Sequence, residues 1–330
     1  MKIVIVKLSA MGDIVHAMVA LQYIKKSNPS IEIDWVVEEV FAPILEDNPH
    51  IDNILTLNLK SIKKNRKLLL GEIRKAKKYS QNGYDLVIDA QGLIKSAMVS
   101  RILGKNIVGF DKNSIREGVA SHFYRQKVSI SYSANTIDRN AKVLSSGLGL
   151  EITPQMIQDK EAFLFYKEDK DINKLLSQKQ KNIIFVIGST WESRNYPKES
   201  FAKLANMLKE NILVSWGSEE ERESAEWIES HSEYAKVLPK IDLNRLKAVI
   251  DKSDLLIGND TGPTHIAWGL NRPSITLFGP TPVSRVYETK INKVLKSNSK
   301  VNVYKLDKND FSIKDIEVEE ILKIAKELLI

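Results

Sequence analysis

Asp13 lies in a stretch of sequence that could do chemistry, VKLSAMGDIVHA at residues 6–17. There an apolar run typical of a strand meets small residues, a glycine and an apolar run typical of a helix. A carboxylate at a helix start can cap the helix, belong to a dinucleotide-binding loop, or act as a catalytic base. The dinucleotide fingerprint needs G-x-G-x-x-G after the strand, and this loop has only Gly12, which argues against NAD or FAD binding by that motif. The helix dipole favours the ionised carboxylate that a base requires, so cap and base both stay open.

The stretch IGSTWESRNYP, residues 187–197, is a second candidate and follows a strand-like run in the second half of the chain. Ser189 and Thr190 offer hydroxyl donors, and Arg194 adds a planar cation suited to bidentate phosphate contacts. Loops with this composition are often only turns, so this stretch gains weight only together with others.

The stretch GNDTGPTHIAWG, residues 258–269, leaves another apolar strand and enters an apolar helix. Thr261 and Gly262 would place N–H groups at the helix N-terminus, where phosphate binds readily, whereas Asp260 suits sugar hydroxyls. FGPTPVSR, residues 278–285, repeats the arrangement after the next strand. Three polar loops at strand ends predict a donor-rich pocket for a nucleotide diphosphate.

Metal-binding signals are weak in this sequence. The D-x-D spacing of Asp169 and Asp171 lies in a lysine-rich segment and not after a strand, so we interpret it as surface charge. The five histidines are scattered, and there is no cysteine, P-loop or G-x-S-x-G sequence. We therefore expect neither metal nor cofactor, and a leaving diphosphate would be stabilised by Arg194 and the turn at 261–262.

Positive charge is concentrated in residues 60–78, which hold nine basic residues and one acid against a net charge of +7 for the whole chain. A local patch of this kind is either a solvated helix face or a surface for a polyanion such as nucleic acid, anionic lipid or a phosphorylated substrate. No apolar run approaches the roughly 18 residues of a membrane span. With 43% apolar residues and no cysteine, we expect a globular chain in the reducing cytosol.

Apolar strand-like runs alternate with helix-length segments in both halves, which predicts two doubly wound α/β domains of Rossmann type. Strands are expected at 2–8, 31–37, 53–57, 84–90 and 106–110, and again at 182–188, 211–216, 235–239 and 274–279 and in DLLIGN before residue 260. The first three helices are expected at about 14–27, 62–81 and 93–103. The predicted boundaries are 1–165 for the first domain, 166–181 for a linker, 182–312 for the second domain and 313–330 for a terminal helix. Two such domains imply a cleft onto which the strand ends open.

Together, four stretches resemble the family 9 glycosyltransferases, the lipopolysaccharide heptosyltransferases of Gram-negative bacteria: VKLSAMGDIVHA, DWVVEE (34–39), DAQGLIKSA (89–97) and GNDTGPTHIA. DAQGLIKSA and SIREGVASHFY (114–124) look more like heptosyltransferases I than II. The resemblance covers nearly the whole chain. It implies a GT-B fold, a metal-independent inverting transfer from ADP-L-glycero-β-D-manno-heptose to the inner Kdo of Kdo-lipid A, and Asp13 as the general base.

The resemblance also implies a donor site in the second domain and an acceptor site in the first. Arg194 stands where the family usually has lysine; Glu221 would hold ribose, Ile241 would meet the adenine, and Asp260 would hold heptose hydroxyls. The implied donor residues are Ser189, Thr190, Arg194, Glu221, Ile241, Asp260, Thr261, Gly262 and His265. The implied acceptor residues are Lys63, Lys64, Arg66, Lys67 and Arg116. We expect the enzyme to be peripheral on the inner face of the inner membrane, bound to its anionic surface, without nucleic acid, and favour a monomer.

Two rival interpretations stay open. One keeps the fold and changes the substrate, as heptosyltransferase II or another nucleotide-sugar enzyme of GT-B fold such as a 2-epimerase. The other is a polyanion- or membrane-binding protein built around residues 60–78, which would not need the three polar loops of the second half.

Overall fold

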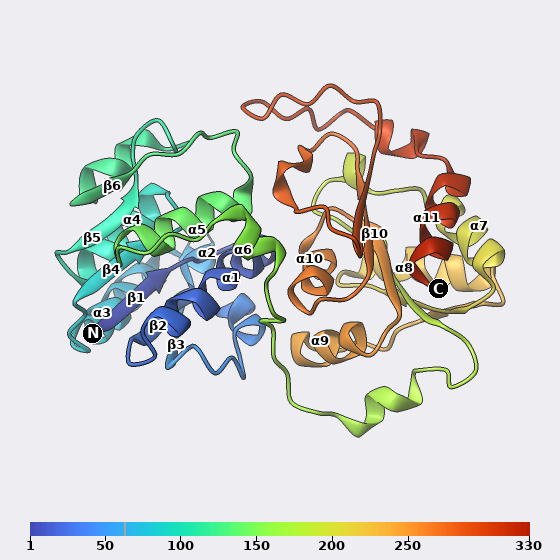
Figure 1. Ribbon diagram of the computed structural model, residues 1–330, viewed down its shortest axis with the longest axis horizontal. Coiled ribbons are helices and arrows are strands. Elements are labelled where there is room, and N and C mark those ends of the chain that lie inside the picture. The colour runs from blue at the N-terminus through green and yellow to red at the C-terminus, as the bar shows by residue number, and fades with distance from the viewer. Residues whose placement is uncertain (63) are drawn as a thin grey trace. The chain divides into compact units, whose positions relative to one another are not determined.

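Two α/β units make up the chain, one from Met1 to Phe165 and the other from Tyr166 to Ile330. The computed structural model describes residues 1–62 and 64–330 (Figure 1). Each unit contains a six-stranded parallel sheet with helices packed on both faces. This confirms the predicted doubly wound α/β class.

The first sheet has the strand order β3-β2-β1-β4-β5-β6. The order reverses between β1 and β4, so that α1, which follows β1, and α4, which follows β4, cover opposite faces of the sheet. Ligands of open parallel sheets bind at such a switch point, beyond the carboxyl ends of the strands. The strands are β1 Lys2–Val6, β2 Glu32–Glu38, β3 Asn53–Leu57, β4 Leu86–Asp89, β5 Ile107–Phe110 and β6 Gln126–Val128. The helices are α1 Met11–Ser27, α2 Leu59–Ile62, α3 Leu69–Ser80, α4 Ile94–Leu103, α5 Thr136–Ser146 and α6 Pro154–Gln158.

Helices α1 and α5 pack on each other over one face of the first sheet, and α3 and α4 pack on each other over the opposite face. Strands β1, β4 and β5 are buried along nearly their whole length, because both of their faces are covered. This explains why they appear in the sequence as continuous apolar runs. The indole of Trp35, fully buried in β2, donates from Nε1 to the carbonyl of Lys7 at 3.2 Å and fixes the end of β1.

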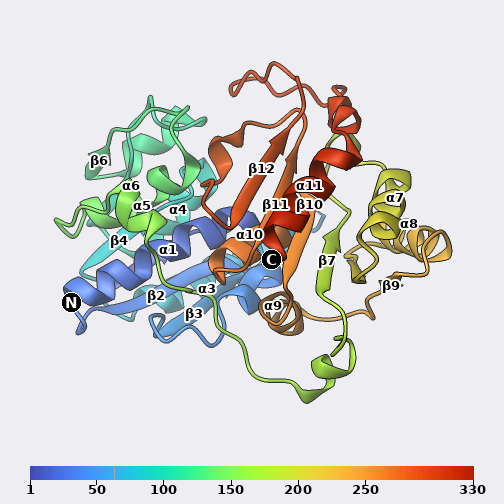
Figure 2. The ribbon, with the colours of Figure 1, turned by 45° about the vertical axis from the view of Figure 1, so that its right-hand side comes forward.

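The second sheet has the order β12-β11-β10-β7-β8-β9, with its switch point between β7 and β10. Figure 2 shows β10, β11 and β12 as neighbouring arrows. Helices α7, α8 and α11 lie on one face and α9 and α10 on the other (Figure 1). The strands are β7 Asn182–Val186, β8 Asn211–Ser215, β9 Ala235–Val237, β10 Leu255–Asn259, β11 Ser274–Phe278 and β12 Asn292–Lys296. The helices are α7 Lys198–Leu208, α8 Glu219–Ser230, α9 Leu243–Asp251, α10 Gly262–Gly269 and α11 Val318–Leu328.

The helix expected at 62–81 is interrupted, which corrects the prediction. Within the described residues, the chain forms α2, then a short 3-10 turn η2 at Arg66–Leu68, then α3. Asn65 has an extended backbone and its side chain accepts a hydrogen bond from the amide of Lys67, so a new helical start begins there. The basic residues therefore divide between a loop after β3 and the exposed side of α3.

The segment 166–181, expected as a linker, packs in the second unit. The Tyr166 hydroxyl donates to Asp251 at 2.6 Å, and Asp169 pairs with Arg245 at 2.7 Å. These contacts hold the segment against α9. Asp171 pairs with Lys174 at 2.6 Å, so each carboxylate of the D-x-D sequence has a cationic partner. Within the described residues, no helix combines the length and apolarity needed to cross a membrane.

Candidate active site

The loop before α1 is fastened to the loop after β4 at the switch point of the first sheet. The side-chain oxygen of Gln91 accepts hydrogen bonds from the backbone amides of Leu8 and Ser9, both at 3.0 Å. A side chain that accepts two consecutive amides fixes the path of that backbone. Gln91 therefore sets where the first turn of α1 begins, and with it the position of Asp13.

Asp89, the last residue of β4, holds this second loop in turn. Its Oδ1 accepts from the amides of Gln91 and Gly92 at 2.9 and 3.0 Å, and its Oδ2 accepts from Ser96 Oγ and the Tyr124 hydroxyl at 2.9 and 2.8 Å. The carboxylate is fully buried, and burial raises its pKa. Four donors on one buried carboxylate make it a structural anchor rather than an exposed base.

The side chain of Lys7 is buried in the same place. Its Nζ donates to the carbonyl of Ala90 at 2.9 Å and to Asn140 Oδ1 at 3.1 Å, which joins the end of β1 to α5. Burial lowers the pKa of Lys7, and the negative charges of Asp13 and Asp89 oppose that shift. The Lys7 amine and the Asp13 carboxylate therefore interact electrostatically.

Asp13 is the third residue of α1 and is partly buried. Its Oδ2 accepts from the backbone amide of Ala10 at 3.4 Å, which is long for a hydrogen bond. Across residues 1–62 and 64–330, Oδ1 has no hydrogen-bond partner. The backbone amides nearby therefore occupy only Oδ2 of Asp13, and Oδ1 can accept a proton.

The acceptor residues implied by the resemblance lie at the same edge of the first sheet, because they follow strand ends. Lys64, Arg66 and Lys67 come after β3, and Arg116 comes after β5; all four are exposed. Their side chains form no ion pair within the described residues. Lys63 lies outside the described residues.

The loops after β7 and β10 meet at the switch point of the second sheet. The amide side chain of Asn259 accepts from the Tyr196 amide at 3.0 Å and donates to the Ile187 carbonyl at 2.6 Å. The 187–197 loop is thus fastened to the end of β10. Within this loop Ser189 Oγ donates to the carbonyl of Trp191 at 2.9 Å, while Thr190 is exposed.

Asp260, directly after β10, is 2% exposed and surrounded by donors. Its Oδ2 accepts from Arg194 Nη2 at 2.9 Å and from Thr281 Oγ1 at 3.0 Å, and its Oδ1 lies 3.2 Å from His265 Nε2. Burial alone would raise the pKa of Asp260, but the His265 hydrogen bond and the charges of Arg194 and Arg285 hold it well below its usual range. Asp260 is therefore an anion at neutral pH.

Arg194, implied by the resemblance to contact phosphate, is paired in the structure with Asp260. Its side chain is 11% exposed, and Nη2 also donates to the Asp260 carbonyl. Burial lowers the pKa of Arg194, the carboxylate of Asp260 opposes that shift, and the charge of Arg285 adds to it. The pair joins the two loops that flank the switch point.

Glu221 is the third residue of α8 and reaches back over the loop after β7. Its Oε2 accepts from the amides of Gly217 and Ser218 at 2.6 and 3.3 Å. A Cβ atom on Gly188 would lie 2.0 Å from the Glu221 carboxyl group, so only glycine leaves room for it. The resemblance implies that Glu221 contacts the donor, and the structure places this residue beside the 187–197 loop.

The remaining donor residues also follow strand ends of the second sheet. Ile241 lies partly buried between β9 and α9. Thr261 occupies the N-cap position of α10, and Gly262 is the first residue of that helix. The nine residues implied for the donor therefore gather along one edge, after β7, β8, β9 and β10.

Sequence reasoning missed three residues of these sites. Gln91 acts through backbone amides of a distant loop, and Thr281 and Arg285 lie far from Asp260 along the chain. In the sequence, Gln91 is marked only by its place in DAQGLIKSA, and Thr281 and Arg285 only by their place in FGPTPVSR.

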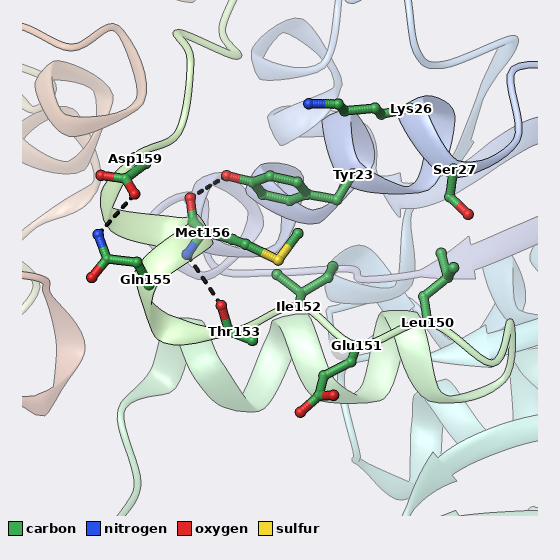
Figure 3. Close-up of a pocket in the computed structure, with 10 residues that line it drawn as sticks. All are labelled: Tyr23, Lys26, Ser27, Leu150, Glu151, Ile152, Thr153, Gln155, Met156 and Asp159. Carbon is green, nitrogen blue, oxygen red and sulfur yellow. Dashed lines mark hydrogen bonds between the residues drawn. The ribbon is translucent and has the colours of Figure 1, made fainter.

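A hollow in the first unit lies elsewhere. It is lined by the last turn of α1 and by residues 150–159, with the Tyr23 hydroxyl donating to the Met156 carbonyl (Figure 3). Asp13 is in the first turn of the same helix, so this hollow is at the opposite end of α1 from the predicted base. None of the predicted site residues lines it. In the described part of the chain, no three or more His, Cys, Asp or Glu side chains are arranged to hold a metal ion.

Comparison with known proteins gives the family. The model of glycosyltransferase family 9 (heptosyltransferase) matches residues 73–313. Lipopolysaccharide heptosyltransferase 1 of Campylobacter coli is 42% identical over 99% of both chains, and that of Escherichia coli K12 is 31% identical over 85% of this chain and 88% of its own. The structure of E. coli heptosyltransferase WaaC with ADP-2-deoxy-2-fluoro heptose matches with a TM-score of 0.81 at 25% identity, covering 99% of each chain, which confirms the GT-B fold. This chain therefore belongs to glycosyltransferase family 9 and is an enzyme of the heptosyltransferase family.

Proposed function

We propose that this enzyme transfers L-glycero-D-manno-heptose from ADP-heptose to the inner Kdo of Kdo-lipid A in lipopolysaccharide core biosynthesis, with inversion and without a metal ion. Relatives named lipopolysaccharide heptosyltransferase 1, one of them 42% identical over the whole chain, support the substrates. The observation that carries the mechanism is Asp13, a fixed carboxylate at the switch point of the first sheet with one oxygen free of protein hydrogen bonds.

The donor binds along the strand ends of the second sheet. An E. coli relative of this fold was solved with ADP-2-deoxy-2-fluoro heptose and with ADP, which supports an ADP-sugar as the donor. Glu221 and Ile241 receive the ribose and adenine, and the start of α10 receives the diphosphate. Asp260, held by Arg194 and Thr281 and lying 3.2 Å from His265 Nε2, accepts a hydroxyl of the heptose.

Transfer is a single displacement. Asp13 Oδ1 accepts the proton of the Kdo hydroxyl as that oxygen bonds to the anomeric carbon, and the bond from that carbon to ADP breaks. One carboxylate suffices, because a retaining double displacement would need a nucleophile as well. The diphosphate leaves with both electrons of the broken bond, and cations and helix N–H groups stabilise its charge.

The acceptor is lipid-anchored and anionic, and the basic residues after β3 and β5 fit it. Lys64, Arg66, Lys67 and Arg116, with Lys63 outside the described residues, would bind Kdo carboxylates and lipid A phosphates. Each exposed cation near an anionic bilayer contributes about 1 kcal/mol of binding free energy. Several together would hold the enzyme against the inner leaflet.

The test measures ADP release by the purified enzyme with ADP-heptose and Kdo-lipid A, singly and together, with and without EDTA. We expect release only with both substrates, unaffected by EDTA, and an α-linked heptose in the product by NMR. Release with an acceptor that already carries one heptose, but not with Kdo-lipid A, would indicate a heptosyltransferase II. Conversion of the sugar nucleotide without any acceptor would indicate an epimerase.

A further inference from the structure

α3 and α4 form a layer over one face of the first sheet, and the 3-10 helix η3, Gly118–Phe123, extends it. α4 packs against both α3 and η3. Glu117, directly before η3, accepts a hydrogen bond from the amide of Ile94 at 2.8 Å, which fastens η3 to the first residue of α4. The three elements therefore form one continuous surface, which we call the α3–α4–η3 layer.

Large apolar side chains are exposed on this layer. Leu70 of α3 is 64% exposed, Met98 of α4 is 55% exposed and Val119 of η3 is 62% exposed. The others are Leu68, directly before α3, Leu69 and Ile94. Six of the eight exposed large apolar side chains among residues 1–62 and 64–165 therefore gather here, and such a cluster marks an interaction surface.

The same layer is strongly basic. Residues 64–80, 92–105 and 112–127, which form the layer and the segments that flank it, hold fourteen lysine and arginine residues against two acids, Glu72 and Glu117. Arg74, Arg101 and Lys105 are exposed, and they form no ion pair within the described residues. None of these three belongs to the acceptor residues implied by the resemblance, so the basic surface is wider than the acceptor site.

Both acids of the layer are bound to backbone amides of the same unit. Glu117 accepts from the amide of Ile94, and Glu72 Oε2 accepts from the amide of Asn58 at 2.8 Å. Both acidic side chains are partly buried. The charge that the layer presents to solvent is therefore almost entirely positive, and it lies on the same elements as the exposed apolar side chains.

An anionic lipid bilayer matches this combination. Its headgroups attract lysine and arginine, and the boundary between headgroups and acyl chains takes up apolar side chains such as leucine and methionine. A nucleic acid would use the cations and leave the apolar side chains in water. The acceptor of the proposed reaction is anchored in a bilayer, so a surface that binds the bilayer itself would bring enzyme and acceptor together.

We propose that the α3–α4–η3 layer docks the enzyme on an anionic bilayer, with Leu70, Met98 and Val119 entering the boundary between headgroups and acyl chains. This inference rests on the proposed function, because the lipid-anchored acceptor is what makes contact with a bilayer useful. It adds contacts with the bilayer that are made by residues outside the acceptor site. Because α3 follows β3 and α4 follows β4, docking through their first turns brings the carboxyl edge of the first sheet close to the headgroups.

The experiment measures flotation of the purified enzyme with vesicles of phosphatidylcholine, either alone or with added phosphatidylglycerol, and without any acceptor. Two double variants of the layer are compared with wild type: Leu70→Gln with Met98→Gln, the apolar pair, and Arg101→Gln with Lys105→Gln, the basic pair. The matched controls lie in the second unit, where Tyr304 is 74% exposed and Lys323 and Lys326 are exposed cations of α11: Tyr304→Gln, and Lys323→Gln with Lys326→Gln.

We expect the wild type to bind only the vesicles that contain phosphatidylglycerol. The apolar pair should weaken this binding about 10- to 100-fold and the basic pair about 10- to 30-fold, whereas both controls should stay within about twofold of wild type. Thermal melting, and heptose transfer to an acceptor freed of its acyl chains, should be unchanged in every variant.

A second readout reports insertion directly. The chain has no cysteine, so Met98→Cys can carry a single fluorophore that is sensitive to its environment, with Tyr304→Cys as the control. We expect the emission of the label at residue 98 to shift to shorter wavelength on anionic vesicles, and that of the label at residue 304 to stay unchanged. This readout decides the question even if the apolar pair folds poorly.

The inference is overturned if the apolar pair binds anionic vesicles within twofold of wild type, or if the label at residue 98 keeps the emission that it has in water. If the wild type transfers heptose but does not bind anionic vesicles, only this inference fails. If the wild type binds the vesicles through this layer but transfers no heptose, the proposed function fails and the docking surface is confirmed.

Discussion

Asp13→Asn separates the two roles that the sequence leaves open for this residue, helix cap and catalytic base. Asparagine keeps an acceptor for the Ala10 amide and removes the negative charge. The hydrogen bond from the Ala10 amide to Asp13 is long, at 3.4 Å, and therefore weak. A negative charge in the first turn of a helix stabilises the helix by about 0.3–1 kcal/mol. We therefore expect Asp13→Asn to lower the free energy of unfolding by at most about 1 kcal/mol, or about 2–4 °C for a unit of this size.

The catalytic effect is expected to be much larger. A positioned base contributes about 100- to 10,000-fold in rate, which is about 2.7–5.5 kcal/mol at 1.36 kcal/mol per factor of ten. This exceeds everything that the cap contributes. A fall in kcat of about 100-fold or more with nearly unchanged stability would therefore identify the carboxylate as a base.

The assay follows ADP release at saturating substrates, with ADP affinity and thermal melting measured on the same preparation. Glu199→Gln is the matched control, because Glu199 is an exposed acid in the first turn of α7. It should lose a similar stability and no activity. Turnover by Asp13→Asn within threefold of wild type would refute the assignment, and so would a rate loss that disappears when the temperature is lowered by the shift in melting point.

Three further outcomes follow from the structure. Gln91→Ala should lower kcat about tenfold with an unchanged KM for the donor, and Gln91→Glu, which keeps an acceptor, should restore most of the rate. Burial lowers the pKa of Lys160 to about 7, so between pH 7 and 10 the unfolded chain holds a proton that the folded chain releases. The free energy of unfolding of the wild type, measured by denaturant titration relative to Lys160→Met, should then rise by up to about 1.4 kcal/mol per pH unit. Equal pH dependence of the two proteins would contradict this prediction. Alanine at Lys64, Arg66 and Lys67 together should raise the KM for Kdo-lipid A and reduce its salt dependence, with ADP affinity unchanged.

The central strands were predictable because both of their faces are buried. β1, for example, is buried from Ile3 to Val6, and it was predicted at 2–8 and is found at Lys2–Val6. β6 is an edge strand of the first sheet and β12 is an edge strand of the second. Neither was predicted, because their sequences QKV and NKVLK are partly exposed and contain no continuous apolar run. α5, Thr136–Ser146, was not predicted either, although its amphipathic pattern is strong.

The candidate sites show the same division between local and distant information. Asp13 and the loops near 189 and 261 were identified because strand, turn and helix follow one another directly in the sequence. Gln91 lies more than 80 residues from the amides it accepts, and Arg285 lies 25 residues beyond Asp260. No spacing rule connects such pairs, since only the folded sheet brings the loops together.

Asp260 can keep its present partners and still hold the sugar, which favours Arg194 as a residue that holds this carboxylate. A carboxylate offers about four lone-pair positions, and Asp260 has contacts from Arg194, Thr281 and His265. About one position therefore stays open for a heptose hydroxyl without displacing any of them. If Arg194 instead left for the diphosphate, a carboxylate that is 2% exposed would lose its cation at the moment when it has to orient the donor. A bound state in which Arg194 stays in place keeps this buried carboxylate paired with its cation.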